Sequence, residues 1–286
     1  MKHILILLIL LTSLKADTKL VGYLPSYRNL DVEKTKLLTD LVLFSVEPQK
    51  NGLLKKDENL LKLLEKVKAI KNCRKFICVG GWGKSDNFKH VTLDSTTRAK
   101  FIATIVKLVK YYELDGVDYD WEHPKNKDEE KAYELLIKET AEKGIKVSVA
   151  AAAWQRFTPQ IFKHIFALNL MSYDHPEEHS TLKSAEADIK DLIKMGCPAE
   201  KINLGVPFYG RHVKNRKGKS YNTLKVTDQT TDIIEGYYFN NVETLKKKVE
   251  LVKKNKLSGI MIWEIEQDDS KMTLLKSLSK AIKASN

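Results

Sequence analysis

Short, apolar segments rich in β-forming residues recur along this chain and alternate with segments of helical periodicity. There are eight of them: 20–24, 41–46, 75–79, 116–121, 146–152, 166–172, 202–207 and 259–263. Between most of them, apolar residues are spaced three or four apart, as in Leu60, Leu64 and Val67. Eight strand–helix repeats in about 270 residues predict an α/β fold, a single-domain (β/α)8 or TIM barrel. An open doubly wound sheet is the alternative, but no G-x-G-x-x-G follows the first strand.

Residues 1–16 have the pattern of a secretory signal. Lys2 precedes an apolar run over 4–11, and a short polar exit ends at Ala16. The run is too short to span a bilayer, which needs about 20 apolar residues. We expect cleavage before Asp17 and an extracellular or periplasmic location. The mature chain, 17–286, is expected to be a monomer and not to insert stably into a membrane. An uncleaved anchor or a buried first helix is the alternative.

The distribution of charge and the positions of the cysteines exclude some classes of partner and of cross-link. The formal net charge is +12, but the basic residues are dispersed along helical segments such as 60–71 and 243–256. A nucleic-acid-binding surface would gather them in one stripe, and no nucleic-acid-binding motif is present, so we expect no nucleic-acid partner. We expect the three cysteines, Cys73, Cys78 and Cys197, to stay unpaired, because the first two flank one predicted strand.

The segment LDGVDYDWEHP at 114–124 gives the strongest functional signal. Side chains alternate along a strand, so Asp118, Asp120 and Glu122 share one face, and the apolar and aromatic residues between them take the other. Acids confined in a row cannot all ionise freely, so at least one should stay neutral near pH 7. A neutral carboxylic acid at the mouth of a barrel can act as a general acid, and Glu122 is last in the row. A solvated acidic edge on a surface strand is the alternative.

This segment resembles the DxxDxDxE signature of glycoside hydrolase family 18, the chitinase family. The four acidic positions are Asp115, Asp118, Asp120 and Glu122, and further matches follow the family order: GGW at 80–82, MSYD at 171–174, GVPFYGR at 205–211 and GIMIW at 259–263. The resemblance implies that 17–286 is a catalytic barrel of this family. It implies a chitinase-like hydrolase of β-1,4-linked N-acetylglucosamine polymers that uses no cofactor or metal.

The resemblance also implies a retaining, substrate-assisted mechanism. Glu122 would protonate the glycosidic oxygen, and the N-acetyl carbonyl of the sugar before the cut would attack its own anomeric carbon. Asp120 would orient the acetamide N–H, and Asp118 would share a proton with Asp120. Tyr173 would hold the acetamide carbonyl, and Asp174 would help keep Glu122 protonated.

Residues of the same motifs are expected to bind the sugars. Trp263 would form the floor under the distorted sugar, and Trp82 would stack the sugar on the leaving side. The remaining residues expected at the substrate site are Tyr23, Gly81, Met171, Tyr209 and Arg211.

The chain departs from the family pattern in several places. Cys78 stands where the family has Ser, so Asp118 is expected to rely on Tyr23 for a hydrogen bond. His123 replaces the usual Tyr. The insertion 212–240, after the seventh strand, is expected to be a lid or a small β-hairpin, too short for the α+β domain that walls the cleft in many family members. A more open groove favours cutting within a polymer.

Other interpretations stay open. HPEEH at 175–179 matches the H-x-x-E-H zinc pattern, which needs a helix presenting both His side chains to one ion. A non-catalytic chitin-binding lectin can use the same fold, although such proteins usually lack the acid at the position of Glu122. An endo-β-N-acetylglucosaminidase or a hydrolase of peptidoglycan or spore glycan would keep the same acids.

Overall fold

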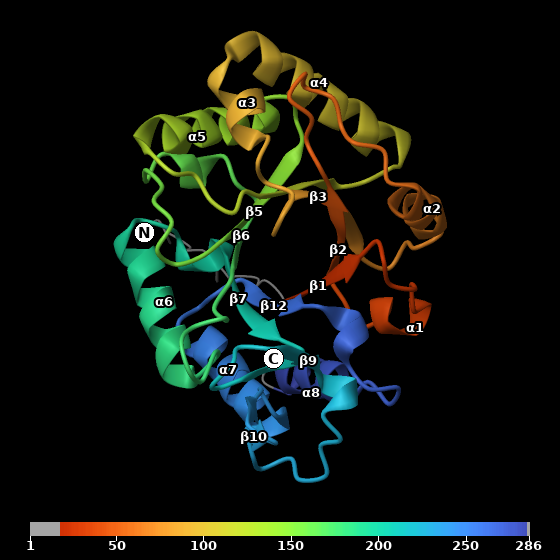
Figure 1. Cartoon of the computed structure of the whole chain (residues 1–286), viewed down its shortest axis with the longest axis vertical. Helices are drawn as coiled ribbons and strands as arrows, with labels where there is room; N and C mark the ends of the chain where they lie inside the picture. The colour runs from red at the N-terminus through yellow and green to blue at the C-terminus, as the bar shows by residue number, and fades with distance from the viewer. Residues whose placement is uncertain (1–17, 285–286) are drawn as a thin grey trace, which may run out of the picture.

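Eight parallel strands close into a barrel, and helices pack around its outside (Figure 1). The computed structural model describes residues 18–284. Each of the eight predicted segments forms one strand, which confirms the single-domain (β/α)8 prediction; the proposed signal, 1–16, lies outside the described residues. In the order around the barrel the strands are β1 (Lys19–Pro25), β12 (Gly259–Trp263), β7 (Ile202–Pro207), β6 (Ala167–Leu170), β5 (Lys146–Ala151), β4 (Gly116–Asp120), β3 (Arg74–Gly80) and β2 (Asp40–Val46).

Most helices begin at a side chain that caps their first turn. Asp57, for example, accepts a hydrogen bond from the Leu60 N–H at the start of α2. The helices are α1 (Val32–Thr35), α2 (Glu58–Val67), α3 (Phe88–Leu93), α4 (Ser95–Tyr111), α5 (Lys127–Ala141), α6 (Leu182–Lys194), α7 (Val242–Lys254) and α8 (Thr273–Lys283). Short 3-10 helices are η1 (Ile161–Lys163), η2 (Ala199–Lys201), η3 (Tyr221–Thr223) and η4 (Ile265–Gln267). In the described part of the chain, no helix is long and apolar enough to cross a membrane.

The two faces of the barrel strands pack into separate apolar clusters. Outward-facing residues such as Val117 and Tyr119 belong to a large cluster with the surrounding helices. Inward-facing residues such as Val21, Phe76 and Met261 form a smaller cluster inside the barrel. Apolar packing fixes both faces of every strand, so the polar residues that also face inward are held in defined positions.

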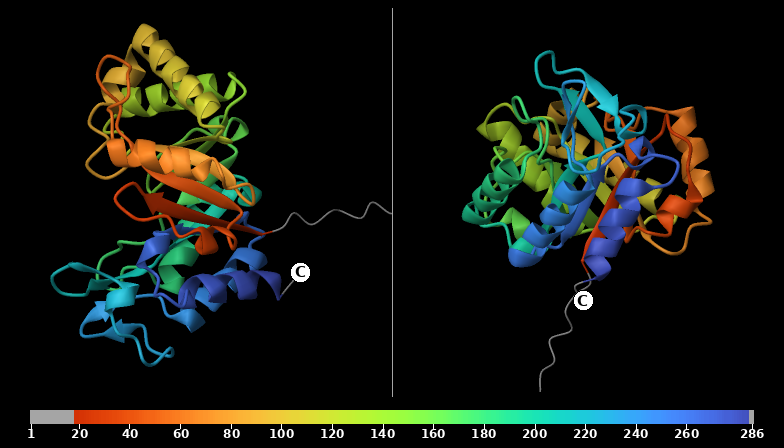
Figure 2. Two further views of the ribbon diagram at one scale, coloured as in Figure 1. Left: turned by 90° about the vertical axis from the view of Figure 1, so that its right-hand side faces the viewer. Right: turned by 90° about the horizontal axis from the view of Figure 1, so that it is seen from below.

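The segment after β7 forms more structure than the predicted lid or hairpin over 212–240. It is a four-stranded antiparallel sheet in the order β10 (Ile233–Ile234), β11 (Tyr237–Tyr238), β8 (Tyr209–His212) and β9 (Gly218–Ser220). The sheet lies at the end of the barrel toward which the strands point (Figure 2). Strands of two to four residues are too short to show the alternation that predicts a strand, so the sequence pattern did not reveal them.

Candidate active site

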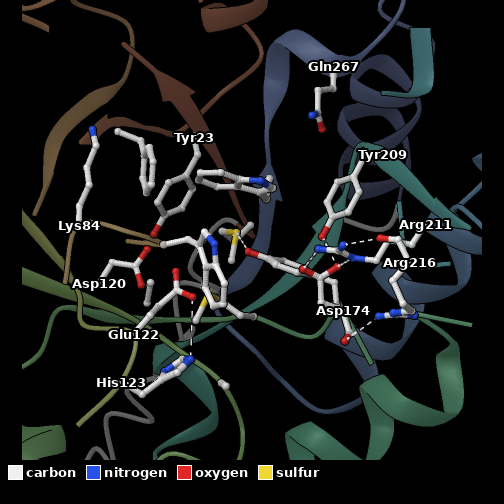
Figure 3. A pocket seen from close by; sticks show the side chains of 18 of the residues that line it. Tyr23, Lys84, Asp120, Glu122, His123, Asp174, Tyr209, Arg211, Arg216 and Gln267 are labelled. Carbon is white, nitrogen blue, oxygen red and sulfur yellow. Dashed lines mark hydrogen bonds and ion pairs between the residues drawn. The ribbon is translucent and has the colours of Figure 1, made fainter. Parts of the chain in front are cut away.

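A cavity of about 800 Å³ opens at the carboxyl ends of the barrel strands. Figure 3 shows Asp120 and Glu122 on one side of it and the group formed by Asp174, Tyr209 and Arg211 on the other. Asp118 lies one layer deeper, and Gly81 belongs to the turn that supports the wall. The other ten predicted site residues line the cavity: Tyr23, Trp82, Asp120, Glu122, Met171, Tyr173, Asp174, Tyr209, Arg211 and Trp263.

The acids of β4 lie on the inward face of the barrel, as the alternation predicted. Asp118 is 0% exposed and Asp120 is 3% exposed, while Val117 and Tyr119 between them pack outward against the helices. Glu122 follows the end of the strand and reaches the cavity. The alternative of a solvated acidic edge is therefore wrong.

Neutral donors surround the innermost acid, Asp118. Its Oδ2 accepts a hydrogen bond from the Tyr23 hydroxyl at 2.7 Å. Its Oδ1 accepts from the Ser148 hydroxyl at 2.6 Å and from the Asn169 amide at 3.0 Å. Burial raises the pKa of Asp118, and these hydrogen bonds oppose the rise. The expected contact with Tyr23 is confirmed. Ser148 adds a hydroxyl donor, and the Cys78 thiol also hydrogen-bonds Asp118.

The next two acids have pKa values raised above their ordinary values. Burial, followed by the negative charges of Glu122 and Asp118, raises the pKa of Asp120 well above its ordinary value. Burial, followed by the charge of Asp174, raises the pKa of Glu122 to about 7. A carboxylic acid that keeps its proton at neutral pH can donate it to a leaving group.

A glycine turn after β3 fixes the end of β4. Gly81 has a φ of +90°, and a Cβ there would lie 2.3 Å from the Phe44 ring. The Gly81 N–H donates to the Asp120 carbonyl at 2.7 Å. The Ser85 hydroxyl donates to that same carbonyl and accepts the Glu122 N–H at 3.0 Å. The GGW motif therefore orders the backbone that carries Glu122.

Asp174, in the loop after β6, has a different environment from the β4 acids. The Tyr209 hydroxyl donates to its Oδ1 at 2.6 Å, and Arg211 donates through Nη2 to Oδ2 at 2.5 Å and through Nε to Oδ1. His179 Nδ1 lies 3.4 Å from Oδ1. Burial alone would raise the pKa of Asp174, but these donors outweigh it and hold the pKa below its ordinary value. Tyr209 and Arg211, expected to bind substrate, direct their hydrogen-bonding groups to Asp174.

Aromatic rings form the floor and the rim of the cavity. Trp263 packs edge-on against Phe44, with 4.6 Å between ring centroids. Trp82 is 82% exposed and Trp154 is 59% exposed, and both line the cavity. His123 contacts Trp154 with 4.5 Å between centroids. Exposed tryptophans beside a cavity provide flat apolar surfaces of the kind on which sugar rings stack.

The zinc interpretation of 175–179 is wrong, because this segment is a loop and not a helix. His175 pairs with Asp188 at 2.9 Å, whereas His179 turns to Asp174. Among residues 18–284, no group of His, Cys, Asp and Glu side chains has the arrangement of a metal site. The two histidines thus have separate partners.

Sequence reasoning missed several residues of the site. Ser148 and Asn169 are polar residues at inward positions of apolar strands, and that pattern was the signal that would have found them. Ser85 lies in a loop and carries no such signal, and His179 was noted only as part of the zinc pattern at 175–179. The other cavity residues that were not predicted are Tyr27, Phe44, Lys84, His123, Ala150, Ala152, Trp154, Arg216, Met261 and Gln267.

Comparisons with known proteins agree with this geometry. The chain is similar to endochitinase 1 of Metarhizium robertsii, with 25% identity covering 70% of this chain and 63% of that protein. The chain spans less than two thirds of the length of this and other curated relatives.

Solved structures share the fold over nearly the whole chain. A chitinase from Bacteroides thetaiotaomicron has a TM-score of 0.85 and 22% identity, covering 94% of this chain and 98% of that one. A family 18 chitinase from the chitin utilization locus of Flavobacterium johnsoniae has a TM-score of 0.80 and 26% identity, covering 94% and 95%. The model of glycosyl hydrolases family 18 matches residues 19–268, which is most of the chain. This protein therefore belongs to glycosyl hydrolases family 18.

Proposed function

We propose that the protein is a chitinase-like glycosidase that hydrolyses β-1,4-linked N-acetylglucosamine polymers by a retaining, substrate-assisted mechanism. The observation that carries this proposal is the position of Glu122, in the cavity with a pKa raised to about 7 and next to Asp120, whose pKa is also raised. A protein nucleophile would be an ionised carboxylate beside the anomeric carbon, and the β4 acids are poorly suited to that role. The chitinase relatives support the substrate class.

The proposed reaction begins with proton transfer from Glu122 to the glycosidic oxygen. The bond between this oxygen and the anomeric carbon breaks, and the carbonyl oxygen of the substrate's acetamide forms a bond to that carbon. The product is a cyclic oxazolinium ion. The Glu122 carboxylate then takes a proton from a water molecule that opens the ring. Two inversions at one carbon give net retention, and Glu122 regains its proton.

Asp120 and Tyr173 would hold the acetamide for this attack. In the proposed complex the Asp120 carboxyl accepts the acetamide N–H and stabilises the positive charge that develops there. Its proton would move toward Asp118 at that stage, because the two acids lie on one inward face of β4. Burial raises the pKa of Tyr173, so its hydroxyl stays neutral and can donate to the carbonyl.

The sugars would lie along the aromatic rim. Trp263 would form the floor at the reacting sugar, and Trp82 would stack the sugar on the leaving side. Tyr23, Gly81 and Met171 would shape the wall of the site. Tyr209 and Arg211 would act on the substrate chiefly by fixing Asp174. We expect the small sheet of β8 to β11 to leave the groove open, which would favour endo cleavage.

A parallel digest of chitin oligomers, glycoprotein glycan and peptidoglycan, with product anomers followed by NMR, tests the proposal. We expect cleavage of the chitin oligomers with β-anomers formed first. Initial α-anomers would overturn retention, and binding without turnover would favour the lectin alternative. A glucosamine before the scissile bond should block cleavage, since it lacks the acetamide; efficient cutting there would indicate a protein nucleophile.

We further propose that residues 1–16 direct secretion and that the mature chain works as a monomer on an extracellular or periplasmic glycan. Lys2 and the apolar run over 4–11 support the proposed secretion. Sequencing the amino terminus of the exported protein should find Asp17 first. Light scattering should give the mass of one chain.

A further inference from the structure

Lys248 of α7 is a buried lysine that the proposed mechanism does not use. Its side chain is 0% exposed, and its three N–H groups donate to the Ser180 carbonyl at 2.9 Å, the Ser180 hydroxyl at 2.7 Å and Asn240 Oδ1 at 2.8 Å. Asn240 Nδ2 donates to the same Ser180 carbonyl at 2.8 Å. All these acceptors are neutral, and burial lowers the pKa of Lys248 to about 7. Burying a lysine side chain without a carboxylate at contact distance is unfavourable. We therefore expect Lys248 to maintain a specific contact that offsets this cost.

The contact is with the loop that carries Asp174. The Ser180 hydroxyl, which accepts from Lys248, donates to the Ser172 carbonyl at 2.9 Å. Residues 172 and 180, the two ends of this loop, are therefore joined at one point beneath it. Inside the loop, Nδ1 of the buried His179 lies 3.4 Å from both the backbone nitrogen and the Oδ1 of Asp174. The position of Asp174 thus depends on the closure of the loop over α7.

Building on the proposed function, we propose that Lys248 is a positioning residue: its side-chain nitrogen closes the loop 172–180 against α7 and holds the Asp174 carboxylate in place across the cavity from Glu122. A methionine would fill the same volume but would leave the Ser180 and Asn240 oxygens without their donor. The loop would then lose its fixed closure. Asp174 would move relative to Glu122, although neither Lys248 nor Ser180 contacts the cavity.

Different charged groups surround Lys248 and Glu122, so an effect of Lys248 on the Glu122 pKa can be traced to one group. Asp188 of α6 and Asp232 of the segment before β10 face Lys248 from a distance, and the charge of Lys248 acts in turn on His179. Glu122 is faced by Asp120 from β4, by Asp174 from the loop and by its neighbour His123. Asp174 acts on Glu122 and belongs to the loop that Lys248 contacts. A substitution of Lys248 should therefore change the Glu122 pKa through the position of Asp174.

The test compares Lys248→Met with Lys201→Met. Lys201 also donates to neutral acceptors, the Phe162 and Ile165 carbonyls at 2.6 and 2.8 Å, but it precedes β7 at the opposite end of the barrel. The readouts are the Glu122 pKa from carboxyl ¹³C NMR and the alkaline limb of the kcat profile. We expect Lys248→Met to lower the Glu122 pKa by about 0.5 unit or more and to move the alkaline limb toward acid by the same amount. Lys201→Met should change neither quantity. An unchanged Glu122 pKa in a folded Lys248→Met variant would overturn the proposal.

A double-mutant cycle with Asp174→Asn establishes the route. If Lys248 acts through Asp174, Lys248→Met should add no further shift in the Asp174→Asn background; additive shifts would contradict that route. Ser180→Ala removes only the hydroxyl between Lys248 and the Ser172 carbonyl and should give a smaller shift in the same direction. It decides the outcome if Lys248→Met does not fold. Because the NMR titration needs no turnover, an inactive wild type would refute the proposed function, whereas the role of Lys248 would still be decided by the Glu122 pKa.

Discussion

Two groups of acids face the same cavity from opposite sides and differ in protonation. The acids of β4 are surrounded by apolar residues, by neutral donors such as Tyr23 and Ser148, and by one another. Asp174 is as close to the cavity but is bound by the guanidinium of Arg211. The pKa values of the β4 acids are raised, and that of Asp174 is lowered. Position at the mouth of a barrel therefore does not set the charge of an acid; the charge of its donor does.

The difference also couples the two groups. Because Asp174 stays ionised, its negative charge disfavours ionisation of Glu122 and adds to the effect of burial. The low pKa of Asp174 on one side of the cavity thus helps to keep the pKa of Glu122 high on the other side. Each substitution below removes one part of this relationship.

Glu122→Gln should have the largest effect, because it removes the transferable proton and keeps the size of the side chain. We expect kcat to fall by about 10³-fold or more, with oligosaccharide affinity retained. Initial rates on chitin oligomers and calorimetric titration measure the two quantities. Glu186→Gln, on the exposed face of α6, is the matched control and should leave both unchanged. Normal turnover by Glu122→Gln would remove Glu122 from the reaction.

Asp120→Asn should have the second-largest effect on kcat. The amide cannot become negative when positive charge develops on the acetamide, so we expect kcat to fall by about 10²-fold with a small change in KM. Asp115→Asn is the control within the same motif, since Asp115 accepts the Lys75 N–H at the other end of β4. That variant should lose stability without losing kcat at saturating substrate. Equal kcat losses in both variants would mean that Asp120 acts only through the fold.

The sequence predicted these two groups unequally well. The β4 acids follow from strand alternation, a local property that both apolar faces of the strand enforce. The environment of Asp174 depends on Arg211, His179 and Lys248, which meet only when β6, β8 and α7 pack together. No spacing rule places such contacts, and so the hydrogen bonds of Tyr209 and Arg211 to Asp174 were not predicted, although both residues line the cavity.

Boundaries were also harder to predict than elements. The pair of Asn240 and Glu243 suggests a helix start, but Asn241 is the cap of α7 and accepts the Thr244 N–H. Asn240 instead serves the buried contact with Lys248. Neighbouring asparagines are equivalent by propensity, and only the tertiary structure assigns one to the helix and the other to the interior.

Asp174→Asn should have an intermediate effect that depends on pH. The substitution removes a negative charge that raises the pKa of Glu122, so that pKa should fall below about 7. Activity needs protonated Glu122 and is lost as pH rises through its pKa. The alkaline limb should therefore move toward acid by about one unit, with a roughly tenfold loss above neutrality and a much smaller loss at pH 5. A pH series of kcat measures this; a limb that stays in place or moves toward alkali would exclude repulsion as the cause.

Cys78→Ser, which restores the residue usual in the family, should have the smallest effect. Asp118 already accepts hydrogen bonds from Tyr23, Ser148 and Asn169, and a carboxylate offers about four acceptor sites. The Cys78 thiol already donates weakly to Asp118. Replacing it by a hydroxyl therefore strengthens an existing contact by only about 1 kcal/mol, part of which offsets burial of the hydroxyl at a position that is 0% exposed. We expect kcat to change by less than about threefold, whereas Ser148→Ala should lower it more. A tenfold gain in Cys78→Ser would show that Ser148 does not replace the family serine and that the thiol limits how β4 holds its inner acid.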